Sequence, residues 1–289
     1  MRKNLVSLSE ECLKFGLARR SDCYPFIWSA DGRDVFRDST FIMIIAAFRF
    51  YAELNDFLAP ERRGREFSSP CARAATAKHM IEALGVPHTE VELVLVNGKP
   101  AGFDHLLENN DRVAVYPHFR RLDVRPLSPI SPSFADHFRF VADAHLGGLA
   151  RLLRMAGFDT LYDNHFQDGE IEEIAGLGRR IVLTRDRELL KRRAVVHGCY
   201  VRETRPAHQL HEIFTRLNLA PQVKPFTLCL GCNAPLRPIP KAEVLTRLPP
   251  SVRERFERFC TCDICQGVFW EGSHWRRMRE LLDYIMSPS

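Results

Sequence analysis

Short apolar runs alternate with helix-like segments throughout residues 134–226. The apolar runs are HFRFVAD, FDTLYDN, RRIVLTRD and GCYVRE, and each has the length of a short strand. They are followed in turn by HLGGLARLLRMAG, DGEIEEIAGLG, RELLKRR and RPAHQLHEIFTRLNL. Strands that alternate with helices in this way are typical of βαβ units. The sequence therefore predicts an α/β domain with a mostly parallel sheet.

Aspartates stand where these predicted strands end, at Asp143, Asp163 and Asp186, and Asp168 begins a following helix. Ligands of parallel sheets bind beyond the carboxyl ends of the strands, so we expect the carboxylates to share one crevice. Clustered carboxylates raise each other's pKa unless a cation neutralises them. Mg²⁺ binds through one or two carboxylates together with water and phosphate, and such ions promote phosphodiester hydrolysis. We therefore predict that all four aspartates are catalytic, and that Asp143, Asp163 and Asp186 hold magnesium or manganese.

Each of these aspartates also has a structural interpretation. Aspartate is common in turns and helix caps, so any one of them can serve the backbone instead of a metal. Asp159 and Asp168 fit turn or cap positions best. Asp143 and Asp186 are the stronger candidates for metal contact.

Three arginines lie close in sequence to the predicted acidic edge, namely Arg151, Arg154 and Arg185. Arg151 and Arg154 are three residues apart and are therefore neighbours on a helix surface. A guanidinium group binds phosphate with two parallel hydrogen bonds, so we predict that these arginines bind RNA. The alternative is that they orient the site by pairing with Asp159, Asp163 or Glu173.

Residues 41–124 have a different pattern of strands and turns. FIMIIAAFRFYAEL and VELVLV are expected strands, CARAATAKHMIEALG is an expected helix, and Asn97-Gly98 is a strong hairpin signal. This order predicts a small β-grasp domain. The segment LVNGKPAGFDHLLENNDRVAVYP resembles the ubiquitin-like sulfur carriers of the thiamine and molybdopterin type. Those carriers end in Gly-Gly, which is absent after the last strand here, so a binding or scaffolding role is expected instead.

Cysteines are concentrated near the C-terminus, in TLCLGC and FCTCDICQG. Two C-x-x-C pairs can be drawn from them, Cys229 with Cys232 and Cys262 with Cys265. Four thiolates give a closed tetrahedral zinc site, which stabilises a fold and has no vacancy for catalysis. Cys260 offers a third sulfur beside the second pair, but Cys262 gives the required gap of two residues.

VFWEGSHWRRMRELLDYIM follows the second pair and predicts a helix whose N-cap is Ser273. Aromatic and arginine side chains together bind single-stranded RNA. We therefore predict that His274, Arg276 and Arg277 contact RNA. The alternative is that Trp270 and Trp275 pack on the zinc knuckles while the arginines form a solvated face.

The stretch FVADAHLGGLARLLRMAGFDTLYDN, together with IVLTRDRELL, resembles the PIN-like RNase family named for the C-terminal domain of the Mut-seven exonuclease. The resemblance implies a PIN-like fold, ribonuclease activity, Asp143 and Asp186 as the first and late acidic site residues, and Asp163 and Asp168 as intermediate ones. An N-terminal β-grasp domain and a C-terminal cysteine region are also known in this family. The expected organisation is an extension (1–40), a ubiquitin-like domain (41–124), a linker (125–133), a PIN-like domain (134–226), and a zinc ribbon with its helix (227–289).

The charge of the chain allows a nucleic-acid partner without requiring one, because the formal net charge is only +5. No apolar run is long enough to span a membrane, and the N-terminus lacks the apolar core of a signal peptide. We therefore expect a cytoplasmic, metal-dependent ribonuclease whose β-grasp domain is available to a protein partner. The alternative is a non-catalytic RNA-binding adaptor of a ribonucleoprotein.

Overall fold

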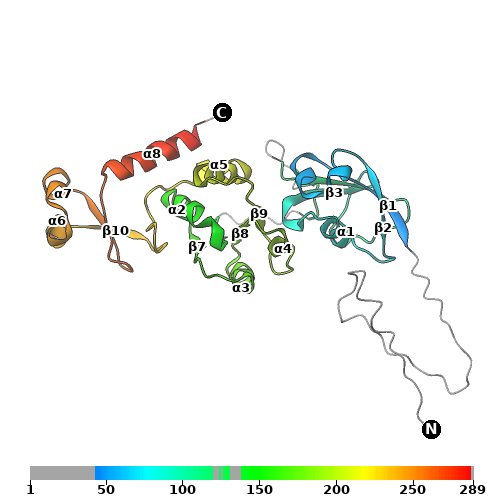
Figure 1. Ribbon diagram of the computed structural model, residues 1–289, viewed down its shortest axis with the longest axis horizontal. Helices are drawn as coiled ribbons and strands as arrows, with labels where there is room; N and C mark the ends of the chain where they lie inside the picture. Colours follow the sequence, from blue (N-terminus) through cyan, green and yellow to red (C-terminus); the bar gives the residue numbers. More distant parts are fainter. Residues whose placement is uncertain (1–42, 120–123, 125, 131–137, 288–289) are drawn as a thin grey trace, which may run out of the picture. The chain divides into compact units, whose positions relative to one another are not determined.

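The computed structural model describes residues 43–119, 124, 126–130 and 138–287 (Figure 1). All of these described residues belong to one compact unit. The extension predicted over residues 1–40 lies outside the described residues, as does part of the predicted linker. Within the described residues, no helix is long and apolar enough to cross a membrane.

The first sheet has five strands in the order β2-β1-β5-β3-β4. Its strands are β1 (Ile44–Phe50), β2 (Phe67–Cys71), β3 (Val91–Val96), β4 (Lys99–Pro100) and β5 (Arg112–Pro117). The first strand pairs in parallel with the last, and α1 (Ala77–Ala83) contributes Met80 and Ile81 to the core on one face. This is the predicted β-grasp arrangement, with the 3-10 helices Ala52–Phe57, Pro60–Arg62 and His88–Glu90 in its connections.

One hairpin and one helix start illustrate how local signals act in this domain. Asn97 and Gly98 have φ angles of 52° and 80°, as a two-residue hairpin turn requires. The helix expected from Cys71 onward is shorter than predicted, because Cys71 ends the strand β2 and Thr76 caps the helix. The Thr76 hydroxyl accepts a hydrogen bond from the amide of His79 at 3.2 Å.

The second sheet confirms the predicted parallel α/β domain. Its order is β7-β6-β8-β9 and all its pairs are parallel. The strands are β6 (Phe140–Ala142), β7 (Thr160–Tyr162), β8 (Ile181–Thr184) and β9 (Gly198–Tyr200). The helices are the 3-10 helix Ala144–Leu146, α2 (Gly147–Met155), α3 (Asp168–Gly178), α4 (Arg187–Leu190) and α5 (Pro206–Leu217).

Helices cover both faces of this sheet (Figure 1). Phe140 and Ala142 pack in one apolar cluster with residues of α2 and α5, whereas Val141 packs in another with residues of α3 and α4. The side chains of each short strand are therefore divided between two cores, as expected for a sheet buried on both faces. The two cores fix the strand ends, where the predicted acidic residues lie.

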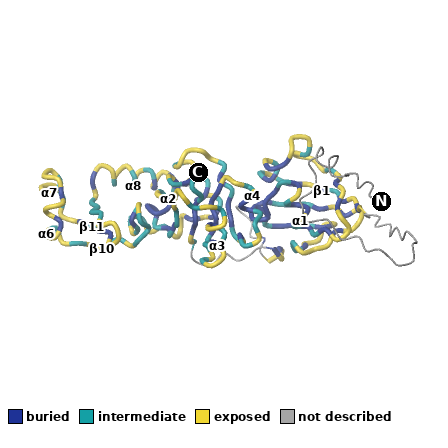
Figure 2. Tube along the Cα trace, turned by 60° about the horizontal axis from the view of Figure 1, so that its bottom comes forward, coloured by how far each residue is buried: buried dark blue, intermediate teal, exposed yellow. Residues whose placement is uncertain are grey.

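The third sheet contains β10 (Leu236–Ile239), β11 (Phe259–Cys262) and β12 (Val268–Phe269), in that order and antiparallel. The 3-10 helix Ala220–Gln222 precedes it, and α6 (Lys241–Val244), the 3-10 helix Leu245–Arg247 and α7 (Pro250–Arg255) lie between its first two strands. The helix α8 (Ser273–Met286) follows, with Gly272 rather than the predicted Ser273 as its N-cap. Figure 2 shows α8 and the α6–α7 segment largely in the intermediate and exposed colours.

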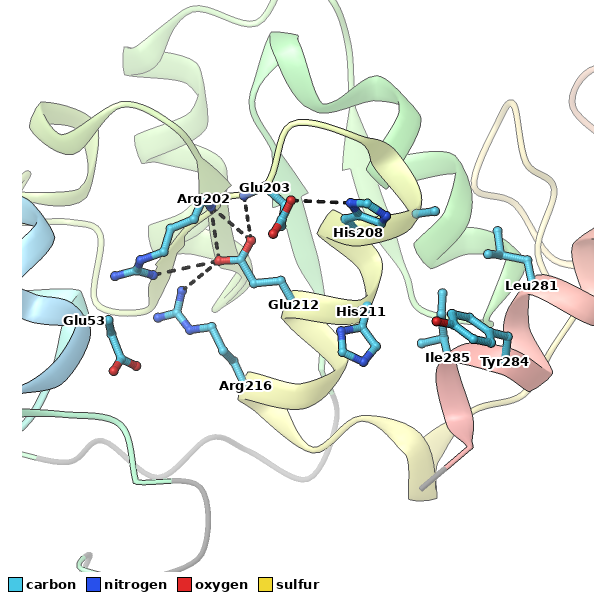
Figure 3. Close-up of a pocket in the computed structure, with 11 residues that line it drawn as sticks. Glu53, Arg202, Glu203, His208, His211, Glu212, Arg216, Leu281, Tyr284 and Ile285 are labelled. Carbon is cyan, nitrogen blue, oxygen red and sulfur yellow. Dashed lines mark hydrogen bonds and ion pairs between the residues drawn. The ribbon is translucent and has the colours of Figure 1, made fainter. Parts of the chain in front are cut away.

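A buried ion cluster joins the β-grasp domain to the α/β domain. The Glu90 carboxylate, which is 1% exposed, accepts hydrogen bonds from Arg216 at 3.0 Å and from Arg202 at 3.2 Å. The same arginines lie 3.9 Å from Glu212 on α5, and dashed lines in Figure 3 mark both ion pairs. Burial raises the pKa of Glu90, but the two guanidinium groups outweigh burial and lower the pKa overall.

Candidate nuclease site and zinc centre

Asp143 lies directly after β6, at the carboxyl end of the sheet, and is half-buried. One oxygen of its carboxylate, Oδ2, accepts a hydrogen bond of 2.6 Å from the Thr184 hydroxyl. Thr184 is the last residue of the neighbouring strand β8 and is completely buried. The hydroxyl therefore fixes the orientation of the carboxylate at the strand end.

Thr184 also joins Asp186 to this arrangement. Its hydroxyl oxygen accepts a hydrogen bond of 2.9 Å from the Asp186 amide. The Asp186 carboxylate caps α4, since its Oδ1 accepts a hydrogen bond of 2.8 Å from the Glu188 amide. One carboxylate oxygen is thus used by the backbone, and the side chain is exposed at the same edge of the sheet as Asp143. The sequence did not lead us to predict a role for Thr184. The available signal was its position at the end of a predicted strand, directly before Arg185-Asp186.

Asp163 stands at the end of the strand on the other side of β6. Ala142 lies opposite Tyr162 in β7 and opposite Leu183 in β8, so Asp143 lies between the two neighbouring strand ends. The Asp163 carboxylate is exposed and accepts hydrogen bonds from the amide of His165 at 2.9 Å and from its ring Nδ1 at 3.0 Å. The backbone and ring of His165 lower the pKa of Asp163, which keeps this carboxylate ionised.

Asp168 occupies a different place from the predicted cap. Gln167 is the N-cap of α3 and forms a reciprocal capping box with Glu170, while Asp168 is the first helical residue. Its carboxylate pairs with Arg192 at 2.9 Å, and the same guanidinium contacts Glu172 at 3.2 Å. Asp168 is therefore engaged in an ion pair between the start of α3 and Arg192, which follows α4, and its predicted catalytic role stays a prediction.

The predicted acidic residues do not form a compact group of metal ligands among the described residues. Among the described residues, the four C-terminal cysteines are the only group of at least three potential metal ligands whose atoms all lie within 4.8 Å of one another. Asp143, Asp163 and Asp186 share one edge of the sheet without meeting this condition. A metal ion at this edge would therefore be held by one or two of the carboxylates with water completing its coordination, which is a mode of binding that Mg²⁺ uses.

The three predicted arginines have different surroundings. Arg151 is exposed on α2, whereas Arg154 is 4% exposed. Arg154 donates hydrogen bonds to the carbonyl oxygens of Thr160 at 2.9 Å, Leu230 at 3.1 Å and Gly231 at 2.7 Å. The prediction that Arg154 binds RNA is therefore corrected, because its guanidinium is buried and occupied by backbone carbonyls.

Arg185 is exposed beside Asp186, but its guanidinium supports a loop. It donates hydrogen bonds to the carbonyl oxygens of Arg202 at 3.3 Å and of Glu203 at 2.7 Å. These bonds tie the end of β8 to the segment before α5. A contact of Arg185 with RNA stays a prediction.

The four predicted zinc ligands meet in space. The sulfur atoms of Cys229, Cys232, Cys262 and Cys265 all lie within 4.8 Å of one another. Cys229 Sγ and Cys265 Sγ are 3.7 Å apart, close to the ~3.8 Å expected for a tetrahedral ion with Zn–S distances of about 2.3 Å. These residues can hold zinc, and Cys260 lies outside the group.

Side chains from the α/β domain hold the first knuckle, residues 229–232. Arg154 binds two of its carbonyls, as described above. The side-chain NH₂ group of Asn233 donates a hydrogen bond of 2.6 Å to Asp159 Oδ1. The side-chain oxygen of Asn233 accepts one of 2.9 Å from the backbone amide of Thr160. Burial raises the pKa of Asp159, but hydrogen bonds from Arg180 and Asn233 outweigh burial and lower it. The ribbon is therefore anchored on the sheet beside β7.

The first turns of α8 present the remaining predicted RNA contacts. His274, Arg276 and Arg277 are exposed, in agreement with an accessible surface. Trp275 is half-buried with its ring centroid 5.0 Å from that of Phe226, and Trp270 lies 6.5 Å from Phe259. The tryptophans therefore pack against Phe226 and Phe259, and the alternative that they pack on the zinc knuckles stays a prediction.

Two family models match this chain. The one described as "Mut7-C RNAse domain" matches residues 138–282, and the one described as "Mut7-C ubiquitin" matches residues 43–123. A comparison with curated proteins gives no match. The crystal structure of H. volcanii small archaeal modifier protein 1 is 18% identical over 26% of this chain and 97% of that chain, with a TM-score of 0.22. The two family matches confirm the predicted order of a ubiquitin-like domain followed by a nuclease domain.

Proposed function

The chain belongs to the Mut7-C RNAse domain family, and on this premise we propose that it is a ribonuclease that hydrolyses RNA phosphodiester bonds with magnesium or manganese. The observation that carries this proposal is the hydrogen-bonded unit of Asp143, Thr184 and Asp186 at the carboxyl ends of two parallel strands. Strand ends are where parallel sheets bind their ligands. A nuclease-like function follows from the family alone, whereas the metal and the catalytic residues are part of the proposal.

Asp143 and Asp186 are the residues that would hold the ion, with Asp163 at the adjacent strand end. When bound, a divalent ion supplies an activated water and neutralises charge on the phosphate. Thr184 donates a hydrogen bond to one oxygen of Asp143, which would hold the carboxylate in one orientation. The other oxygen is left available to bind the ion. Arg151 on α2 is free to hold a phosphate of the substrate. Asp168 is the fourth acidic candidate, and its carboxylate would have to leave its ion pair with Arg192 to contact the ion.

The C-terminal ribbon has a structural role in this proposal. Zinc on the four cysteines would fold the knuckles, because a closed site of four thiolates has no open position for a reaction. The ribbon would place His274, Arg276 and Arg277 beside the path of the RNA. The β-grasp domain remains the surface on which we expect a protein partner.

Labelled RNA incubated with the full chain tests the proposal. We expect cleavage that depends on added Mn²⁺ and falls to background in Asp143→Asn, whereas Asp104→Asn, which changes an exposed aspartate of the β-grasp domain, cleaves like the wild type. Withholding Mn²⁺ is preferable to adding a chelator, because a chelator would also remove zinc. RNA that stays intact but binds equally to the wild type and Asp143→Asn would identify an RNA-binding adaptor instead.

A further inference from the structure

A groove of about 720 Å³ lies along the zinc ribbon, the start of α8 and one residue of α2. Its volume falls within the ~300–1,000 Å³ typical of ligand pockets. The groove is notable for its aromatic lining, which consists of Phe226, Phe269, Trp270 and Trp275. Its basic lining consists of three arginines, Arg151, Arg258 and Arg279, and one histidine, His274.

Each of the two tryptophans packs against one phenylalanine and remains partly accessible. Trp275 contacts Phe226 with a ring-centroid distance of 5.0 Å and an interplanar angle of 35°. Both tryptophans are only half-buried, and both line the groove. An anchored aromatic ring with an accessible surface is a stacking platform for a nucleobase, since every base has a π face.

The charge of the groove favours a phosphate-linked ligand. Arg258 pairs with Glu271 at 3.0 Å and Arg279 with Asp283 at 3.0 Å, so these cations are partly neutralised. Arg151 is exposed, and no hydrogen bond or ion pair is found for it among the described residues. Its helix α2 begins at Gly147, four residues after Asp143. The uncommitted guanidinium therefore lies on the helix that connects the groove to the acidic edge.

We propose that this groove binds an unpaired base of single-stranded RNA, stacked on Trp270 or Trp275, with the adjoining phosphate at Arg151 and the strand continuing toward Asp143. This inference rests on the proposed nuclease function and deepens it, because it assigns single-stranded RNA as the substrate class. Double-stranded RNA hides the faces of its bases and cannot use the groove in this way.

Tryptophan fluorescence tests the proposal on the full, zinc-loaded chain. Two of the three tryptophans of the chain, Trp270 and Trp275, line the groove, so base stacking should quench much of the emission. The probe is a short oligoadenylate, added to Asp143→Asn without Mn²⁺ so that no RNA is cut. We expect quenching, and an affinity about tenfold lower for the same strand with abasic sites, because stacking is worth about 1–3 kcal/mol per base.

Variants separate stacking from structure. Trp275→Leu should bind oligoadenylate about tenfold more weakly and Trp275→Phe should restore most of the affinity, with equal zinc content in both proteins. Equal binding of intact and abasic strands, or no quenching, would overturn the proposal. Because the readout is binding, a failure here is distinguishable from a failure of cleavage, which would overturn the nuclease proposal instead.

Discussion

The Glu90 carboxylate accepts hydrogen bonds of 3.0 Å from the Arg216 guanidinium, and their side chains are only 1% and 6% exposed. Glu90 belongs to the β-grasp domain and Arg216 to α5 of the nuclease domain. A charge buried at such a junction is tolerated only when it is paired. The pair therefore links the two domains through charges that neutralise each other.

Glu90→Gln should lower the stability of the chain. The substitution leaves the buried Arg216 and the half-buried Arg202 with only the more distant Glu212 carboxylate, and loss of one partner of a buried ion pair costs about 3–5 kcal/mol. Calorimetry should show a thermal midpoint lower by several degrees. Glu61→Gln, which changes an exposed glutamate of the same domain, is the matched control and should unfold like the wild type. An unchanged midpoint in Glu90→Gln would show that the pair contributes nothing.

The same carboxylate makes the junction sensitive to acid. Its pKa is lowered in the folded chain, since Arg216 and Arg202 outweigh the effect of burial. A lowered folded pKa gives stability that is complete above the unfolded value, about 4.3, and is lost as the pH falls through the folded value. The stability difference between wild type and Glu90→Gln should therefore be largest near neutral pH and shrink below about pH 4. Urea unfolding of both proteins across this range measures it.

Thr184 should be required for cleavage although it is buried away from the substrate. Thr184→Val removes the hydroxyl that holds Asp143 and accepts from the Asp186 amide. Loss of such a partner behind a metal ligand typically costs about 10–100-fold in activity or metal affinity. Thr184→Ser keeps the hydroxyl and should retain most of the cleavage rate. Equal rates in the valine and serine variants would show that the hydroxyl does not position Asp143.

Local sequence signals predicted the strands, helices and turns of this structure, but they did not predict the contacts between residues far apart in the sequence. Strand and helix alternation identified the parallel sheet, and the turn residues Asn97 and Gly98 identified a hairpin, because both depend on neighbouring residues alone. The spacing of Arg151 and Arg154 could not show which of them points inward. Arg154 points inward because it binds the carbonyl oxygens of Leu230 and Gly231, which lie 76 and 77 residues further along the chain. Thr184 was missed for the same reason, since its partner Asp143 is 41 residues distant.

The sulfur ligands should be separable by single substitutions. Cys262→Ser should lose bound zinc and the folded ribbon, since the energy of metal binding is also the folding energy of such a site. Cys260→Ser is the matched control two residues away, and because Cys260 lies outside the ligand group it should keep its zinc. Metal analysis after gel filtration gives the zinc content, and limited proteolysis reports the ribbon. Loss of zinc from Cys260→Ser would place that sulfur in the site.

Arg151 and Arg154 offer a final pair of matched substitutions, one turn apart on α2. Arg154→Met should destabilise the chain by a few kcal/mol, because the carbonyls of Thr160, Leu230 and Gly231 lose a charged donor in a buried setting. The thermal midpoint of this variant should fall, and the first zinc knuckle, residues 229–232, should become more sensitive to protease.

Arg151→Met should leave the midpoint unchanged, since the Arg151 side chain is exposed. It should instead weaken RNA binding and lower the slope of log affinity against log salt by about 0.7, the value for one phosphate contact on a single strand. Titrations at several salt concentrations measure this slope, and the interpretation fails if Arg154→Met changes the slope while Arg151→Met does not.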